Sequence, residues 1–223
     1  VCKIVSCGCD IETTEFNKQL ACKYDYFYFA AGFHPECLEN TDLSEAVHAI
    51  TTYAENKKCV AVGEIGLDYH WMSSSREKQK EFFTAQIETA KQLNLPVIVH
   101  DREAHKDTLD ILKSTKPSGV VHCFSGSKEM AKEIIGLGMY IGLNGVVTFK
   151  NARKSLEVVH AIPLERLVLE TDCPYLAPEP KRGRRNDSSL IVHIAERIAE
   201  ELGMNTQELL DITAENAKRL YNL

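Results

Sequence analysis

The chain has 223 residues and a formal net charge of −6, with 44% hydrophobic and 26% charged residues. This length suits one α/β domain, and no linker-like segment interrupts it, so we expect a single domain over residues 1–223. The acidic balance argues against sequence-independent coating of nucleic acid, but it is compatible with an active site that admits one strand end.

No apolar run approaches the roughly 18 residues that would span a bilayer, and residues 1–5 are too short for the apolar part of a signal peptide. The eight cysteines include no C-x-x-C pair, which fits a reducing compartment. Cys59, Cys123 and Cys173 lie in or beside apolar strands and are interpreted as small hydrophobic residues. We expect a cytoplasmic protein, monomeric and without a membrane partner.

Short apolar strands alternate with helices along the whole chain. Seven strands are expected, at residues 3–7, 26–31, 96–100, 119–124, 139–143 and 167–171 and within 60–69. Helices are expected at residues 10–24, 42–57, 74–93, 104–116, 127–137, 152–161, 189–202 and 206–221. Asp42 with Glu45 and Ser74 with Glu77 have the spacing of capping boxes, and Gly203 is suited to end the helix before it.

Strict alternation of helices with short apolar strands predicts a parallel sheet that is covered on both sides or closed into a barrel. A TIM-type (β/α)8 barrel has eight strands and typically about 250 residues. We therefore expect such a barrel without its first strand and helix. The alternative is an open doubly wound sheet, but no G-x-G-x-x-G or Walker-type loop follows a strand, so its usual nucleotide site is missing.

Four expected strands end in a residue that can bind a metal ion. Glu64 lies between two glycines in V-A-V-G-E-I-G-L-D-Y, where an apolar strand is expected to end. His100 closes P-V-I-V-H-D-R, His122 closes G-V-V-H-C-F, and Asp172 closes L-V-L-E-T-D-C-P. Strand C-termini share one rim of a barrel, so these side chains should converge there. Two imidazoles and two carboxylates suit zinc, manganese or a related divalent ion.

Longer motifs surround these residues from one end of the chain to the other. They are V-G-E-I-G-L-D-Y, G-F-H-P, V-I-V-H-D-R, H-C-F-S-G, E-T-D-C-P-Y-L-A-P, the R-N at Arg185 and Asn186, and the closing E-N-A-K-R-L-Y. With them the chain resembles the TatD family of metal-dependent deoxyribonucleases, within the amidohydrolase-like barrels. The resemblance covers the whole chain.

The resemblance implies a role for each candidate residue. Glu64 would bridge two metal ions, and His100 and His122 would be ligands of one of them. Asp172 would be a ligand of the other ion and would orient or deprotonate the attacking water. His34 would line the substrate site.

The chain departs from the family pattern in three places. The family opens with a strand ending in His-x-His, whose ligands share a metal with Asp172, and the chain contains no such pair. We expect the natural protein to carry a further N-terminal segment with this pair, and to bind up to two zinc, manganese or magnesium ions, against one or none in this chain. Glu36 stands where a second histidine is common, and Ser188 where proline is common, so substrate contacts follow the family pattern less closely than metal contacts do.

The chemistry that the resemblance implies is phosphodiester hydrolysis, with DNA strand ends or single strands as substrate. Asp172 and Glu64 would be the catalytic carboxylates. Arg102 and the basic run K-R-G-R-R, which ends at Arg185, can hold flanking phosphates because a guanidinium binds phosphate through two hydrogen bonds. Aromatic residues near the strand ends, Trp71 among them, can stack on an end nucleotide.

Two other functions remain open at this point. Barrels of this architecture also hydrolyse amides, lactones and esters, and loss of Arg102 should harm a nuclease but not a lactonase. The missing His-x-His pair is also compatible with an inactive binding relative. Metal-dependent turnover of DNA would separate an enzyme from such a relative.

Overall fold

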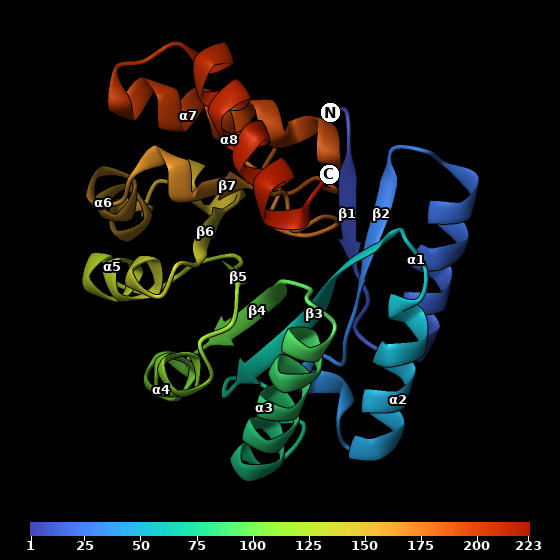
Figure 1. The fold of residues 1–223 in the computed structure, drawn as a ribbon. Helices are drawn as coiled ribbons and strands as arrows, with labels where there is room; N and C mark the ends of the chain where they lie inside the picture. The colour runs from blue at the N-terminus through green and yellow to red at the C-terminus, as the bar shows by residue number, and fades with distance from the viewer. The chain divides into compact units, whose positions relative to one another are not determined.

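A computed structural model describes residues 1–223 in full. The chain forms two compact units, Val1–Val120 and Val121–Leu223. Helices and strands alternate along both units (Figure 1). Every predicted strand and helix is present, with ends displaced by a few residues, which confirms the α/β assignment.

The first unit contains four parallel strands that pair in chain order, β1 (Ile4–Cys7), β2 (Phe27–Ala31), β3 (Cys59–Asp68) and β4 (Val97–Arg102). The helices between and after them are α1 (Ile11–Lys23), α2 (Leu43–Ala54), α3 (Arg76–Gln92) and α4 (His105–Thr115). Helix α1 packs on β2 and α3 packs on β3 (Figure 1). Their fully buried side chains include Phe29, Ile65, Leu67, Phe83 and Ile87. This apolar contact fixes the long strand β3 that carries Glu64.

The strand β5 (Gly119–Val121) spans the boundary between the units in the chain. In the second unit, β6 (Tyr140–Leu143) pairs in parallel with β7 (Leu167–Leu169). The helices are α5 (Lys128–Gly136), α6 (Arg153–Ala161), α7 (Ile191–Leu202) and α8 (Thr206–Tyr221), and α8 packs on β7. Gly203 ends α7 in the left-handed conformation, with φ of 65°, as predicted.

The structure corrects the predicted ends of several strands. Glu64 was expected where its strand ends, but β3 continues to Asp68, because the strand keeps its pairing with β4 beyond Glu64. Strand β4 likewise continues past His100 to Arg102. Strand β5 ends early, so His122 follows it directly.

Two predictions about single side chains are also corrected. The cap of α3 is Ser75 rather than Ser74, because the Ser75 hydroxyl accepts the Lys78 N–H at 3.2 Å. Cys59 is buried as expected, but Cys173 is exposed because it follows β7 in an irregular segment. Asp42 is confirmed as the cap of α2.

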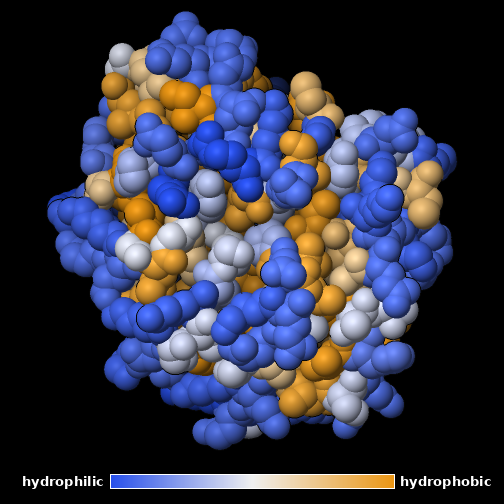
Figure 2. Space-filling model, in the orientation of Figure 1, coloured by the Kyte–Doolittle hydropathy of each residue, from blue (hydrophilic) through white to orange (hydrophobic).

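The face seen in Figure 2 is mostly hydrophilic, with apolar residues in scattered groups. None of the helices combines the length and the apolar character needed to cross a membrane.

Candidate metal centre

Glu64, His34 and His100 form a compact cluster in the first unit. The atoms that they can offer to a metal ion all lie within 4.8 Å of one another. Glu64 Oε1 is 2.9 Å from His100 Nδ1 and 3.5 Å from His34 Nε2, and the two imidazole rings meet edge to face with centroids 4.4 Å apart. The structure thus brings together Glu64 and His100, predicted as ligands, with His34, predicted as a substrate contact.

The backbone around Glu64 explains how a residue inside a strand takes part in this cluster. The pairing of β3 with β4 shifts register between Val62 and Ile65, which turns the chain locally at Glu64. Gly66 pairs with His100 across the two strands and has a φ of 149°. A Cβ atom at this position would lie 2.0 Å from the His100 carbonyl oxygen. Glycine is therefore required for β4 to bring His100 this close to Glu64.

The ring of His34 is oriented so that its Nε2 can donate a hydrogen bond toward Glu64. Its Nδ1 accepts the main-chain N–H of Glu36 at 3.3 Å. A ring nitrogen that accepts has no proton, so the neutral ring carries its proton on Nε2, the atom that faces Glu64. This tautomer suits a contact to an anionic or carbonyl oxygen better than a bond to a cation.

His100 lies between two carboxylates. Its Nδ1 faces Glu64, and its Nε2 is 3.0 Å from Asp68 Oδ2. The Asp68 side chain is only 1% exposed. Burial acts to raise the pKa of Asp68, but the His100 imidazole and the Trp71 N–H outweigh it and lower that pKa to about 2. Asp68 is therefore ionised at neutral pH and can accept a hydrogen bond from the Nε2–H group of His100.

The donors of this cluster fit a divalent ion. Glu64 and His100 offer a carboxylate oxygen and an imidazole nitrogen, the ligand types that zinc and manganese bind. The carboxylate behind His100 is the usual partner of a metal-binding histidine. Glu64 and His100 would hold the ion, which when bound would neutralise developing negative charge and lower the pKa of water.

In the second unit, His122 lies beside Glu170. His122 Nδ1 is 3.6 Å from Glu170 Oε1, which also accepts the main-chain N–H of Cys123. Cys123 has a positive φ of 44°, and its sulfur accepts the Asn144 amide N–H at 2.9 Å. Burial raises the pKa of the Cys123 thiol to about 12, against a lowering effect of His122. The thiol is therefore protonated, and Glu170 fixes the segment that carries His122.

Asp172 lies in a turn after β7. Its φ is 53°, a strained value for aspartate, and such values are often found in functional sites. The main-chain oxygen of Asp172 accepts the Tyr175 N–H at 2.9 Å. The buried Asn186 amide donates to the carbonyl oxygens of Thr171 and Tyr175. Asn186 therefore closes the turn that presents Asp172.

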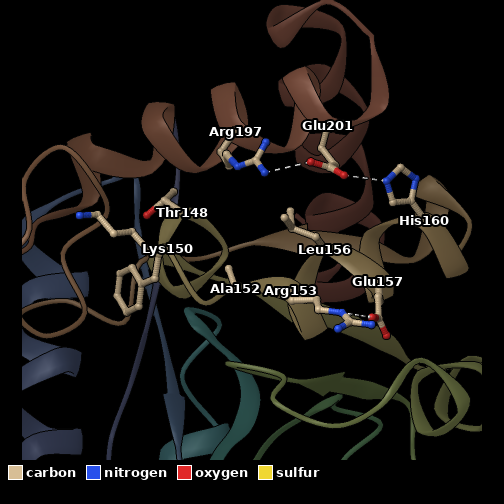
Figure 3. Close-up of a pocket in the computed structure, with 10 residues that line it drawn as sticks. Thr148, Lys150, Ala152, Arg153, Leu156, Glu157, His160, Arg197 and Glu201 are labelled. Atoms are coloured by element: carbon tan, nitrogen blue, oxygen red, sulfur yellow. Dashed lines mark hydrogen bonds and ion pairs between the residues drawn. The ribbon is translucent and has the colours of Figure 1, made fainter.

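A separate pocket of about 560 Å³ lies in the second unit beside α6 and α7 (Figure 3). Several of its charged side chains form ion pairs with one another. Arg153 Nε lies 2.9 Å from Glu157, and Glu201 accepts from Arg197 at 2.9 Å and contacts His160 at the same distance. The hydrogen bond to His160 holds the pKa of Glu201 below its usual value. This pocket contains none of the predicted site residues.

The sequence model of the family described as TatD related DNase matches residues 1–222 of the chain. The chain belongs to this family. A Bacillus subtilis (strain 168) protein named uncharacterized metal-dependent hydrolase YabD is 44% identical over 99% of this chain and 88% of its own length. The 3'-5' ssDNA/RNA exonuclease TatD of Erwinia tasmaniensis is 37% identical over 89% of this chain and 80% of its own.

The crystal structure of YJJV, a TatD homologue from Escherichia coli K12, matches with a TM-score of 0.91 at 31% identity, over 100% of this chain and 87% of that one. This match confirms the predicted resemblance to the TatD family and the TIM-type barrel class.

The two arginines predicted as substrate contacts of this TatD chain are both exposed. Arg102 ends β4, and its guanidinium carbon lies 5.5 Å from the centroid of the Trp71 ring. Arg185 directly precedes the buried Asn186 in the second unit. Each arginine is thus accessible to a phosphate.

Sequence reasoning missed three residues that hold the TatD site residues in place. Asp68 binds His100, Glu170 accepts the main-chain N–H of Cys123 beside His122, and Asn186 closes the Asp172 turn. Each lies within a motif that carried the family resemblance, so the motifs contained the signal. A motif does not show which of its residues touch each other.

Proposed function

We propose that this chain, a metal-dependent hydrolase of the TatD family, cleaves phosphodiester bonds at the ends of single-stranded nucleic acid. The observation that carries the proposal is the His34, Glu64 and His100 cluster, in which a carboxylate and an imidazole suited to a divalent ion lie beside a hydrogen-bond donor. That combination suits a phosphate group, which brings oxygens for both the ion and the donor.

The proposal gives the metal-site residues separate tasks. Glu64 and His100 hold a divalent ion, and in the second unit His122 and Asp172 are proposed as metal ligands as well. Asp172 is the general base, because an ionised carboxylate can take the proton of the attacking water. Glu170 and Asn186 support this by fixing the segments that carry His122 and Asp172.

The substrate contacts follow from charge and tautomer. His34 donates from Nε2 to a phosphoryl oxygen, since its Nδ1 is occupied by the Glu36 N–H. Arg102 and Arg185 bind flanking phosphates as exposed cations. The names of the exonuclease relatives support single-stranded DNA or RNA as the substrate class. We propose a cytoplasmic monomer, which size-exclusion chromatography with light scattering can check.

A substrate panel tests this function against lactone and ester hydrolysis. With manganese or zinc supplied, the chain should shorten an end-labelled single-stranded oligonucleotide and leave simple lactones intact. R102A should lower the cleavage of the oligonucleotide. R76A is a matched control, because Arg76 is also exposed and also lies over an aromatic ring, at 4.2 Å from the Tyr69 centroid. Lactone turnover without oligonucleotide cleavage would refute the proposal.

A further inference from the structure

Asp68 contacts two functional parts of the first unit at once. Its Oδ2 is 3.0 Å from His100 Nε2, and its Oδ1 accepts the main-chain N–H groups of His70 and Trp71, each at 2.9 Å. The Asp68 backbone is fixed in turn by Gln79, whose amide group accepts the Asp68 N–H at 2.8 Å and donates to its carbonyl at 3.0 Å. One buried carboxylate therefore sets both the His100 ring and the loop that begins at His70.

That loop presents an aromatic ring beside a cation. Trp71 is 60% exposed, and the Arg102 guanidinium carbon lies 5.5 Å from its ring centroid. The His70 ring meets the Trp71 ring edge to face at 4.9 Å, and His70 Nδ1 is held at 2.9 Å by Glu103. Arg102 is itself in register with Asp68 across β3 and β4. The Trp71 and Arg102 pair thus has a fixed place relative to His100.

The chemistry of this pair selects one kind of ligand. Exposed aromatic rings stack on nucleobases of any sequence, and a neighbouring arginine binds the phosphate of the same strand. A neutral ester or lactone offers neither a flat base nor a phosphate. The pair therefore suits single-stranded nucleic acid.

We propose that Trp71 stacks on a nucleobase of the substrate strand while Arg102 binds a phosphate of the same strand, and that Asp68 is the positioning residue that joins this pair to His100. The proposal rests on the proposed function, since it assigns a substrate contact to that hydrolase. It adds a nucleobase contact and a link between this contact and the metal ligand.

The role of Asp68 at His100 follows from which ring nitrogen keeps its proton. The neutral ring carries one proton, and with that proton on Nε2, hydrogen-bonded to the Asp68 oxygen at 3.0 Å, Nδ1 can offer its lone pair to an ion beside Glu64. In the D68N variant, the amide would donate to Nε2 instead and move the ring proton to Nδ1. That variant would therefore block the ligand atom of His100, while its amide oxygen still accepts the N–H groups of the loop.

Two variants of Asp68 separate its two contacts. D68N should lower zinc affinity, measured by calorimetry, by about 10- to 100-fold, the usual effect of losing the partner of a metal-binding histidine. It should leave the emission of Trp71, the single tryptophan of the chain, unchanged. D68A should lower zinc affinity and also release the loop, which will shift Trp71 emission toward that of a solvated indole.

D101N is the matched control for the carboxylate. Asp101 is a neighbour of His100 in β4, its side chain is 4% exposed, and its Oδ2 binds the imidazole of His105 at 2.8 Å. D101N therefore removes a similar contact without touching His100, and it should change neither zinc affinity nor Trp71 emission. W71A tests the stacking contact and should weaken oligo(dT) binding about 5- to 150-fold at unchanged zinc affinity.

The outcomes separate this proposal from the proposed function. If the parent chain cleaves DNA but D68N binds zinc as tightly as the parent, Asp68 does not position His100. If W71A binds oligo(dT) as tightly as the parent, the stacking contact is refuted. A parent chain that binds zinc and oligo(dT) without cleaving would refute the nuclease function and leave the Asp68 proposal standing. A parent chain that binds neither overturns both.

Discussion

The buried Asn186 side chain holds the turn that presents Asp172, the proposed general base. Asn186 is 2% exposed, and its amide group donates to the carbonyl oxygens of Thr171 and Tyr175 on both sides of Asp172. N186A removes both hydrogen bonds, each of which contributes about 0.5–1.5 kcal/mol net. We expect a loss of about 2 kcal/mol in the free energy of unfolding, which for a chain of this size lowers Tm by roughly 4–8 °C.

The same variant should lower the rate of hydrolysis, because Asp172 keeps its positive φ only while the turn is held. Differential scanning calorimetry and oligonucleotide cleavage, each compared with the parent, measure the two effects. N151A is the control, since Asn151 is an exposed asparagine in the same unit. A Tm within about 1 °C of the parent, together with full activity, would show that the turn is held by other contacts.

Three further predictions test separate parts of the account. D172N should abolish hydrolysis at unchanged Tm, because an amide cannot take the proton of water; retained turnover would place the base elsewhere. Hydrogen bonds from Lys80 and the Tyr69 hydroxyl lower the pKa of Asp107 below its ordinary value of 3.8. Ionised Asp107 therefore stabilises the folded chain above pH 3.8, and this stabilisation is lost as the pH falls through the lowered pKa. The stability difference between the parent and D107N should therefore shrink in acid, and a difference independent of pH would contradict this. Burial raises the pKa of Cys59 to about 11, so this thiol should resist iodoacetamide at about pH 8 in the folded chain. Labelling of Cys59 as fast as a free thiol, measured by mass spectrometry, would contradict this.

The alternation of strands and helices was predictable because it rests on local patterns. Each apolar run forms one buried strand, and the acidic or hydroxyl residue before a helix can act as its cap, as Asp42 does. The choice between Ser74 and Ser75 was not predictable, because both have a hydroxyl and only the path of the preceding loop decides.

The bend at Glu64 and the buried partners of the histidines depend on contacts between distant parts of the chain. The register shift beside Glu64 arises from the pairing of β3 with β4, a strand that follows much later in the sequence. Asp68 meets His100 through the same pairing. No local pattern distinguishes an acid that binds an imidazole from an acid at a strand end, so only the structure could show the role of Asp68.

In the proposed reaction, hydrolysis depends on an ion held by Glu64 and His100. The most direct measurement follows cleavage of an end-labelled single-stranded oligonucleotide by the metal-free chain as zinc or manganese is added back, with H100A and H48A beside the parent. His48 is an exposed histidine of the same unit, so H48A controls for loss of an imidazole. We predict that activity appears only with metal, that H48A matches the parent, and that H100A loses both tight metal binding and cleavage. Cleavage by H100A at the parent rate, or by the parent in EDTA, would contradict the account.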